Sequence, residues 1–139
     1  MDAITFTVAG MEPKPQGSKR HLGNGVMVES CKTLKPWRYL VSQAAIATGV
    51  PLIRGPVSLS VVFLFQRPKG HYGAKGLKPS APRFHMVKPD GSKLLRSTED
   101  ALSKLLYEDD ARIVMGTFQK RYCIGDERPG ALITLIPLA

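Results

Sequence analysis

The fold of this chain is decided by a stretch that begins Lys88-Pro89-Asp90-Gly91-Ser92-Lys93-Leu94-Leu95-Arg96 and closes on Tyr107-Glu108-Asp109-Asp110. Six of the eleven acidic residues of the chain fall within these 23 positions: Asp90, Glu99, Asp100, Glu108, Asp109 and Asp110. Carboxylates gathered in this way inside a basic protein suggest a metal ion that works on a polyanion.

Apolar residues in this stretch recur at intervals of three and four, which predicts an amphipathic helix. They are Leu94, Leu95, Thr98, Ala101, Leu102, Leu105 and Leu106. Asp90 is a good N-cap for a helix that begins directly after it and ends near residue 106 or 107. A β-branched pair at 113–114 then predicts a strand, so Asp109 and Asp110 are expected on the turn between helix and strand.

The polar side of the predicted helix carries Ser92, Arg96, Glu99 and Ser103 in one stripe, so Glu99 is expected to pair with Arg96. Carboxylates are hard ligands that suit Mg²⁺ or Mn²⁺. Two or three of them around a metal ion can position a phosphodiester and activate water. The alternative is that Asp90 only caps the helix and that Asp109 and Asp110 only occupy a turn.

Length and composition indicate one globular domain. The chain has 139 residues, 43% of them hydrophobic, which is enough for a real core and argues against wholesale disorder. It contains no run of about 18 apolar residues, which excludes a transmembrane helix. Cys31 and Cys123 form no metal motif. Because the first five residues do not resemble a secretory signal, both are expected to be free thiols in the cytoplasm.

Charge is unevenly distributed along the chain. Residues 1–89 carry 13 Lys and Arg against 3 Asp and Glu, whereas residues 90–139 carry 7 against 8. The basic part favours a nucleic-acid partner whose phosphates contact Lys and Arg. The alternative is a basic surface that binds nothing.

The remaining pattern predicts an α+β domain with a mixed sheet and two main helices. Strands are expected at 4–8, where Ile4, Phe6 and Val8 would be buried, at 57–65 in the centre of the sheet, at 113–118 and at 131–136. A helix is expected from Thr33 or Lys35 to about Gly49, with Trp37 in the core.

Two basic segments are candidates for DNA contacts. A hairpin is predicted around a Gly23-Asn24-Gly25 tip, and a mobile basic loop is predicted over about 67–89, where aromatic and basic residues alternate. The residues expected to contact DNA are Lys14, Lys19, Arg20, Arg67, Lys69, His71, Tyr72, Lys75, Lys88 and Lys93. Both segments would also be compatible with ordinary solvated loops.

The order Lys-Pro-Asp, Lys-Leu-x-Arg, Asp-Ala-Leu and Asp-Asp before a strand resembles the RusA family of Holliday junction resolvases. It is carried here by Lys88 to Arg96, by Asp100-Ala101-Leu102 and by Asp109-Asp110. Pro15 to Arg20 and the loop from Arg67 to Tyr72 are similar to phage and actinobacterial members. The resemblance spans most of the chain and implies the RusA fold and a homodimer.

The resemblance also implies site residues. Asp90 and Asp110 would be metal-binding and catalytic aspartates, Asp109 would assist, and Arg96 would match the family's catalytic basic residue. The family's second aspartate falls on Ser92, a neutral and weak metal ligand. Three explanations stay open: the chain is catalytically impaired, water held by Ser92 completes a weaker site, or Glu99 reaches into the site.

These observations together predict an endodeoxyribonuclease dependent on Mg²⁺, or on Mn²⁺, that resolves four-way DNA junctions in recombination and repair. The expected partners are branched DNA and a second copy of the chain, without a membrane, in the cytoplasm of a bacterial host and with a phage gene as one source. The alternatives are a junction-binding protein with impaired catalysis and a nuclease for flaps or forks.

Overall fold

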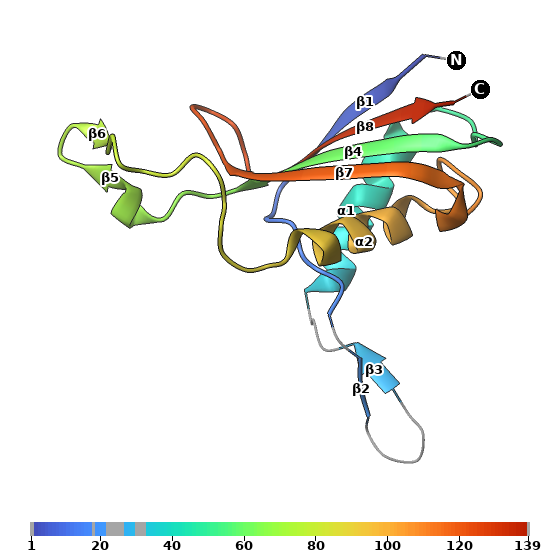
Figure 1. Cartoon of the computed structure of the whole chain (residues 1–139), viewed down its shortest axis with the longest axis horizontal. Coiled ribbons are helices and arrows are strands. Elements are labelled where there is room, and N and C mark those ends of the chain that lie inside the picture. The colour runs from blue at the N-terminus through green and yellow to red at the C-terminus, as the bar shows by residue number, and fades with distance from the viewer. Residues whose placement is uncertain (1, 18, 22–26, 30–32, 139) are drawn as a thin grey trace.

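A four-stranded mixed sheet forms the body of the protein, and the α-helices pack on one face of it (Figure 1). This computed structural model describes residues 2–17, 19–21, 27–29 and 33–138. The strands lie in the order β1 (Ile4–Ala9), β8 (Gly130–Pro137), β4 (Val57–Phe65) and β7 (Ile113–Tyr122). The predicted α+β class with a mixed sheet and two helices is therefore confirmed.

Strand β4 is the centre of the sheet, as its sequence predicts. It pairs antiparallel with β8, where Val61 faces Ile133, and parallel with β7, where Val61 faces Phe118. Its alternate residues Val57, Leu59, Val61 and Phe63 are all buried in the core. A strand that is hydrogen-bonded on both edges and covered by helices accounts for this apolar sequence.

Strand β1 lies at an edge rather than in the middle of the sheet, because it pairs only with β8. Val8 is fully buried, but Ile4 and Phe6 are only partly buried against the core. The prediction that all three residues would be buried is therefore wrong for Ile4 and Phe6. Their alternation indicates a strand correctly, but it does not reveal that one edge of the strand is unpaired.

Helix α1 (Leu34–Ala47) and helix α2 (Gly91–Leu102) share the core beneath the sheet. Trp37, Val41 and Ala45 form the buried face of α1, as their helical spacing predicts. Gly49, with a φ of 69°, follows α1 and adopts the left-handed conformation that commonly ends helices. No helix among the described residues is long and apolar enough to cross a membrane.

Helix α2 ends at Leu102, one turn earlier than the sequence predicts. Ser103 is extended, and Lys104 has a φ of 68°, a conformation that non-glycine residues rarely adopt. Leu106 and Tyr107 remain buried, and the Tyr107 hydroxyl donates a 2.6 Å hydrogen bond to the carbonyl of Glu99. The apolar spacing therefore continues past the end of the helix because Leu106 and Tyr107 pack in the core from the turn that follows it.

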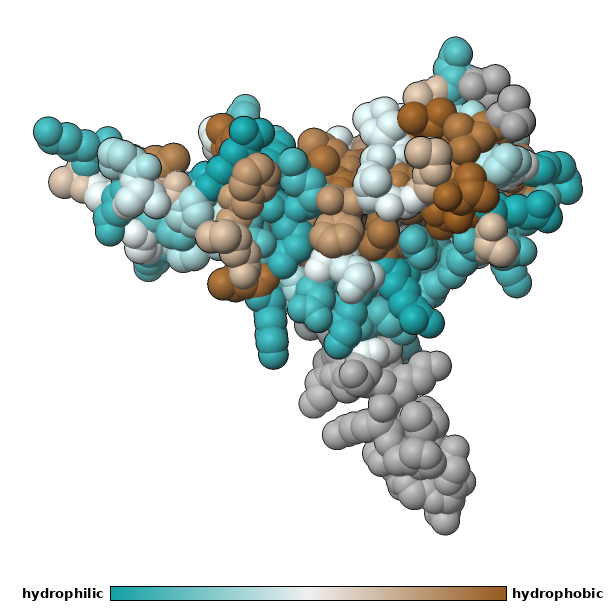
Figure 2. Space-filling model, in the orientation of Figure 1, coloured by the Kyte–Doolittle hydropathy of each residue, from teal (hydrophilic) through white to brown (hydrophobic). Residues whose placement is uncertain are grey.

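Two small hairpins project from the body of the protein (Figure 1). β2 (Lys19–His21) pairs with β3 (Met27–Glu29), while the predicted Gly23-Asn24-Gly25 tip lies outside the described residues. Between β4 and α2, a 3-10 turn η1 (Lys69–His71) leads into β5 (Tyr72–Gly73) and β6 (Gly76–Leu77). The predicted irregular segment thus contains a short hairpin, which Figure 2 shows as a mainly hydrophilic arm.

Candidate active site

Asp90 occupies the N-cap position of α2, as predicted, but its carboxylate accepts no capping hydrogen bond. The side chain is exposed. Its charge acts on Lys120 of β7, where burial lowers the pKa of the ammonium group and Asp90 partly offsets this effect. Capping alone therefore does not account for an aspartate at this position.

Gly91 allows α2 to approach β7 closely. A Cβ atom at Gly91 would lie 1.8 Å from Cε1 of Phe118, which is far inside van der Waals contact. The ring of Phe118 thus packs directly on the helix backbone. This contact holds the N-terminus of α2, and with it Asp90, against β7.

A second group of carboxylates lies at the other end of α2. The side chains of Asp100 and Asp110 share a hydrogen bond, and Asp110 opens the 3-10 turn η2 (Asp110–Arg112). Burial, this hydrogen bond and the charge of Asp100 raise the pKa of Asp110 from 3.8 to about 6. Asp110 therefore releases its proton at a higher pH than an isolated aspartate would.

Glu99 belongs to the same group. Burial raises the pKa of its carboxyl, and the charges of Asp110 and Asp100 raise it further. Asp109 has a different role, because its Oδ1 accepts a 2.9 Å hydrogen bond from the amide of Ala111 and so caps η2. The three carboxyl groups of Glu99, Asp100 and Asp110 are together called the acidic cluster below.

The predicted ion pair between Arg96 and Glu99 is not formed. Among the described residues the ion pairs are Arg112 with Glu108, at 3.1 Å, and Arg121 with Glu127, at 2.6 Å. Glu99 is half-buried beside Asp110, whereas Arg96 is exposed and lines a hollow of about 350 Å³ together with Gln16, Gly17 and Lys93. Arg96 lowers the pKa of both Glu99 and Asp110, so it remains close to the acidic cluster.

The predicted site residues thus fall into two groups. Asp90 and Ser92 lie at the start of α2, and ten residues at 1.5 Å each place Asp90 about 15 Å from Asp100 along the helix axis. Asp110 is part of the acidic cluster, and Arg96 lies close to it. Within the described part of the chain, no three His, Cys, Asp or Glu side chains are arranged as a ready metal site.

Asp100 is the residue that reasoning from the sequence missed. It was visible as part of Asp100-Ala101-Leu102, ten residues after Asp90, but its partner Asp110 comes from a separate element. The donor chemistry of the acidic cluster suits a hard divalent cation, because the positive charge of such an ion would offset the repulsion between the carboxylates.

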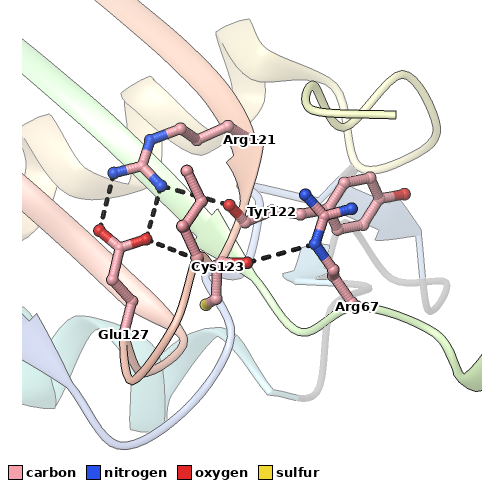
Figure 3. A network of polar contacts seen from close by, with 6 residues as sticks. Arg67, Arg121, Tyr122, Cys123 and Glu127 are labelled. Carbon is pink, nitrogen blue, oxygen red and sulfur yellow. Dashed lines mark hydrogen bonds and ion pairs between the residues drawn. The ribbon is translucent and has the colours of Figure 1, made fainter. Parts of the chain in front are cut away.

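Arg67 is a correction to the predicted DNA contacts, because it is buried with an exposed fraction of 9%. Its Nε donates to the carbonyl of Cys123 at 3.3 Å (Figure 3). Its Nη1 donates to the carbonyl of Pro82 at 2.7 Å, and the guanidinium lies 5.3 Å from the centre of the Tyr122 ring. Arg67 therefore fastens the arm to the end of β7 and is not available to phosphates.

The other predicted DNA contacts differ in exposure. His71 is partly buried against Tyr122, with the ring centres 4.8 Å apart. Lys14 is half-buried. For Lys19 and Arg20 only the backbone is described, as part of β2. Exposed positions are held by Lys69, Tyr72, Lys75, Lys88 and Lys93.

Comparison with known proteins connects both the acidic and the basic parts of the chain to one family. The model of the family described as "Endodeoxyribonuclease RusA" matches residues 10–136. A protein of Bacillus subtilis (strain 168), named "Uncharacterized protein YqaN", is 33% identical over 121 residues, which cover 82% of this chain and 84% of that protein. The family match begins directly after β1 and includes the segment that follows it, α2 and the acidic cluster.

Proposed function

Because the chain belongs to the RusA family of endodeoxyribonucleases, we propose that it hydrolyses phosphodiester bonds in branched DNA, and in four-way junctions above all. The observation that carries this proposal is the hydrogen-bonded pair of Asp100 and Asp110, with the charge of Arg96, which lies on the same helix as Asp100, acting on it. Carboxylates that repel one another next to a cation are a common arrangement at phosphoryl-transfer sites.

We propose that Asp110 and Asp100 hold a divalent cation, Mg²⁺ or Mn²⁺, with Glu99 as the third carboxylate. When bound, the ion would supply Lewis-acid chemistry and a more acidic water. Asp109 supports this arrangement by capping the turn that carries Asp110. Arg96 would contact the phosphate and stabilise the negative charge that develops during hydrolysis.

Asp90 remains part of the proposed site, as the family resemblance implies. Its distance from Asp100 along α2 means that it would not bind the same ion unless the site rearranges on DNA. Ser92 is exposed on the first turn of α2, and its neutral hydroxyl adds no charge there. Glu99 adds a carboxylate to the acidic cluster, and this would compensate for the negative charge that is lost where Ser92 replaces the family's aspartate.

A homodimer would present two such sites to the two-fold symmetry of a junction. Support comes from β7, which forms an outer edge of the sheet and carries the exposed apolar residues Val114, Met115 and Phe118. Exposed apolar edge strands are typical association surfaces. Light scattering on the purified protein would measure its mass, and a monomer at all accessible concentrations would contradict this part of the proposal.

The test is cleavage of a labelled synthetic four-way junction in Mg²⁺ or Mn²⁺. The natural chain is compared with Asp110→Asn and Ser92→Asp, and with Asp126→Asn as an exposed carboxylate control. Cleavage that is lost in Asp110→Asn but kept in Asp126→Asn supports the nuclease. Cleavage by Ser92→Asp alone would mean that the natural chain is an impaired resolvase.

One second function is compatible with the site, namely junction binding without cleavage. It is favoured by Ser92 and by the absence of a ready three-ligand site among the described residues. It predicts selective binding of junctions over duplex in EDTA, with no cutting by any variant. Flaps and forks in the same substrate panel separate a junction resolvase from a nuclease for other branched DNA.

A further inference from the structure

A hollow of about 370 Å³ is lined in part by Lys88 and Pro89, the two residues that precede Asp90. One wall is formed by the segment that follows β1 and contains Glu12, Pro13, Lys14 and Pro15. The other walls include Phe65, His85, Lys88 and Pro89. None of these residues belongs to the acidic cluster, and the hollow is not used by the roles proposed above.

The wall that contains residues 12–15 is held in place from both sides. Ser97 of α2 donates a 2.7 Å hydrogen bond to the carbonyl of Lys14, and the amide of Gln16 donates to the carbonyl of Lys93 at 3.0 Å. On the sheet side, Glu12 Oε2 accepts a 2.9 Å hydrogen bond from the amide of Gln66. The hollow is therefore built on α2 and β4 and does not depend on a loose loop.

The inner wall is flat and aromatic. His85 stacks on Phe65 with ring centres 3.7 Å apart and an angle of 13° between the planes. Burial and the nearby Lys120 lower the pKa of His85, which favours the uncharged ring. Its exposed fraction is 9%, and its Nδ1 is buried without a hydrogen-bond partner among the described residues. Three prolines complete these apolar surroundings.

The charged residues that line the hollow are two lysines and one glutamate, Glu12, whose carboxylate accepts the hydrogen bond from the amide of Gln66. Lys14 and Lys88 line it, and on the other side of the segment 12–17 the hollow of about 350 Å³ contains Lys93 and Arg96. The two hollows together are lined by four cations, of which Lys93 and Arg96 belong to α2. Lys88 lies two residues before Asp90, and Arg96 acts on the acidic cluster, so these cations are available to the phosphates of a single DNA strand.

We propose that the hollow of 370 Å³ binds one unpaired nucleotide of the substrate strand, with its base against the proline and His85–Phe65 walls and its phosphate on Lys14 and Lys88. This inference rests on the proposed function and adds to it the part of the substrate that is recognised beside the site. A duplex is too wide to enter, and a free anion would have no use for the apolar walls.

The experiment measures binding in EDTA, so that cleavage does not enter the result. Junctions carry one additional unpaired nucleotide at successive positions around the crossover, and each is paired with a junction in which that nucleotide is abasic. At one position the intact nucleotide should bind the natural chain about tenfold more tightly than the abasic one, because stacking on an aromatic wall is of this size. This ratio is obtained without any substitution.

Three variants assign the effect to the hollow. His85→Ala should reduce the ratio to about one, while Lys14→Gln and Lys88→Gln should weaken both junctions equally and lower the slope of log affinity against log salt by about one each. Lys104→Gln, an exposed lysine beyond the other end of α2, is the matched control and should change neither quantity. Circular dichroism checks that His85→Ala is folded.

The outcomes separate this inference from the proposed function. If the natural chain binds junctions but the ratio is one at every position, the nucleotide subsite is wrong and junction binding stands. If Lys88→Gln lowers the affinity for junctions no more than Lys104→Gln does, the proposed contact between Lys88 and a phosphate is wrong. If the natural chain binds no junction at all, the proposed function fails and the subsite fails with it.

Discussion

The carboxyl groups of Asp100 and Asp110 share a hydrogen bond although they come from α2 and from the turn before β7. Two carboxyls in such contact repel each other when both are ionised, so Asp110 loses its proton at a higher pH than an isolated aspartate does. This relationship decides how the site should respond to pH, to metal ions and to substitution.

The first prediction concerns stability of the metal-free protein. The pKa of Asp110 is raised from 3.8 to about 6, so its contribution to stability is complete below about pH 3.8 and is lost as pH rises through 6. Asp110→Asn should therefore be more stable than the natural chain at pH 7.5, by about 1 kcal/mol or less for an exposed group. At pH 3.5 this advantage should vanish.

Thermal unfolding of both proteins at the two pH values checks this, with Asp126→Asn as the control for charge alone. Adding Mg²⁺ or Mn²⁺ at pH 7.5 should raise the melting temperature of the natural chain but not of Asp110→Asn, because only the natural site gains by binding the ion. An equal rise in both proteins would contradict the assignment of the metal to Asp110.

The second prediction tests the contact between Gly91 and Phe118. Gly91→Ala should destabilise the protein by about 1–2 kcal/mol although alanine favours helices, because its Cβ would overlap the aromatic ring. In a Phe118→Ala background the same substitution should become neutral or stabilising. A double-mutant cycle in urea measures this coupling, and additive effects would show that the contact does not constrain α2.

The third prediction concerns Glu127, whose pKa is lowered to about 2 by its hydrogen bonds with Arg121 (Figure 3). Its contribution to stability is present above the ordinary pKa of 4.5 and is lost as pH falls towards 2. Glu127→Gln should cost about 1–2 kcal/mol at pH 7, since two charge-assisted hydrogen bonds of 2.6 and 2.8 Å are weakened.

The loss of stability caused by Glu127→Gln should become smaller as the pH approaches 2. Asp126→Asn, on the neighbouring exposed position, should change stability by less than about 0.5 kcal/mol. Urea unfolding as a function of pH provides both values, and a Glu127→Gln loss that is independent of pH would be inconsistent with the pairing.

The fourth prediction separates structural from DNA-contacting cations on the arm. Arg67→Ala should destabilise the protein by about 2–3 kcal/mol, because it leaves the carbonyls of Pro82 and Cys123 without their donor. Lys69→Gln and Lys75→Gln, at exposed positions, should leave stability unchanged and weaken junction binding with a reduced salt dependence. Stability and junction binding are measured on the same three variants. A stability loss in the lysine variants without one in Arg67→Ala would refute this assignment of structural and DNA-contacting cations.

Local patterns predicted most of the elements because their physical causes are local. Alternation identified 57–65 as the central strand, and helical spacing identified the buried face of α1 that contains Trp37. Asp90 marked the start of α2 because an N-cap needs only its own backbone neighbours. Asp109 and Asp110 were placed correctly between helix and strand for the same reason.

Features that depend on distant contacts were not predictable in this way. The end of α2 at Leu102 depends on Tyr107, which forms a bridge to Ile53 while its hydroxyl returns to Glu99. Arg67 looked like a phosphate contact, yet it is buried because the end of β7 offers it a carbonyl and an aromatic ring. Helical spacing alone suggested that Arg96 would pair with Glu99, but Asp110 and Asp100 surround that carboxyl.

The sequence by itself determined the α+β class, the central strand, the charge division along the chain and the family to which it belongs, because these follow from short-range periodicity and from residue order. Only the tertiary structure decided that Asp110 meets Asp100 rather than Asp90, and that Lys14 and Lys88 share a hollow with His85. Those pairs come from segments far apart in the chain, and they meet only after α2 packs against β7 and the segment after β1 is bonded to α2.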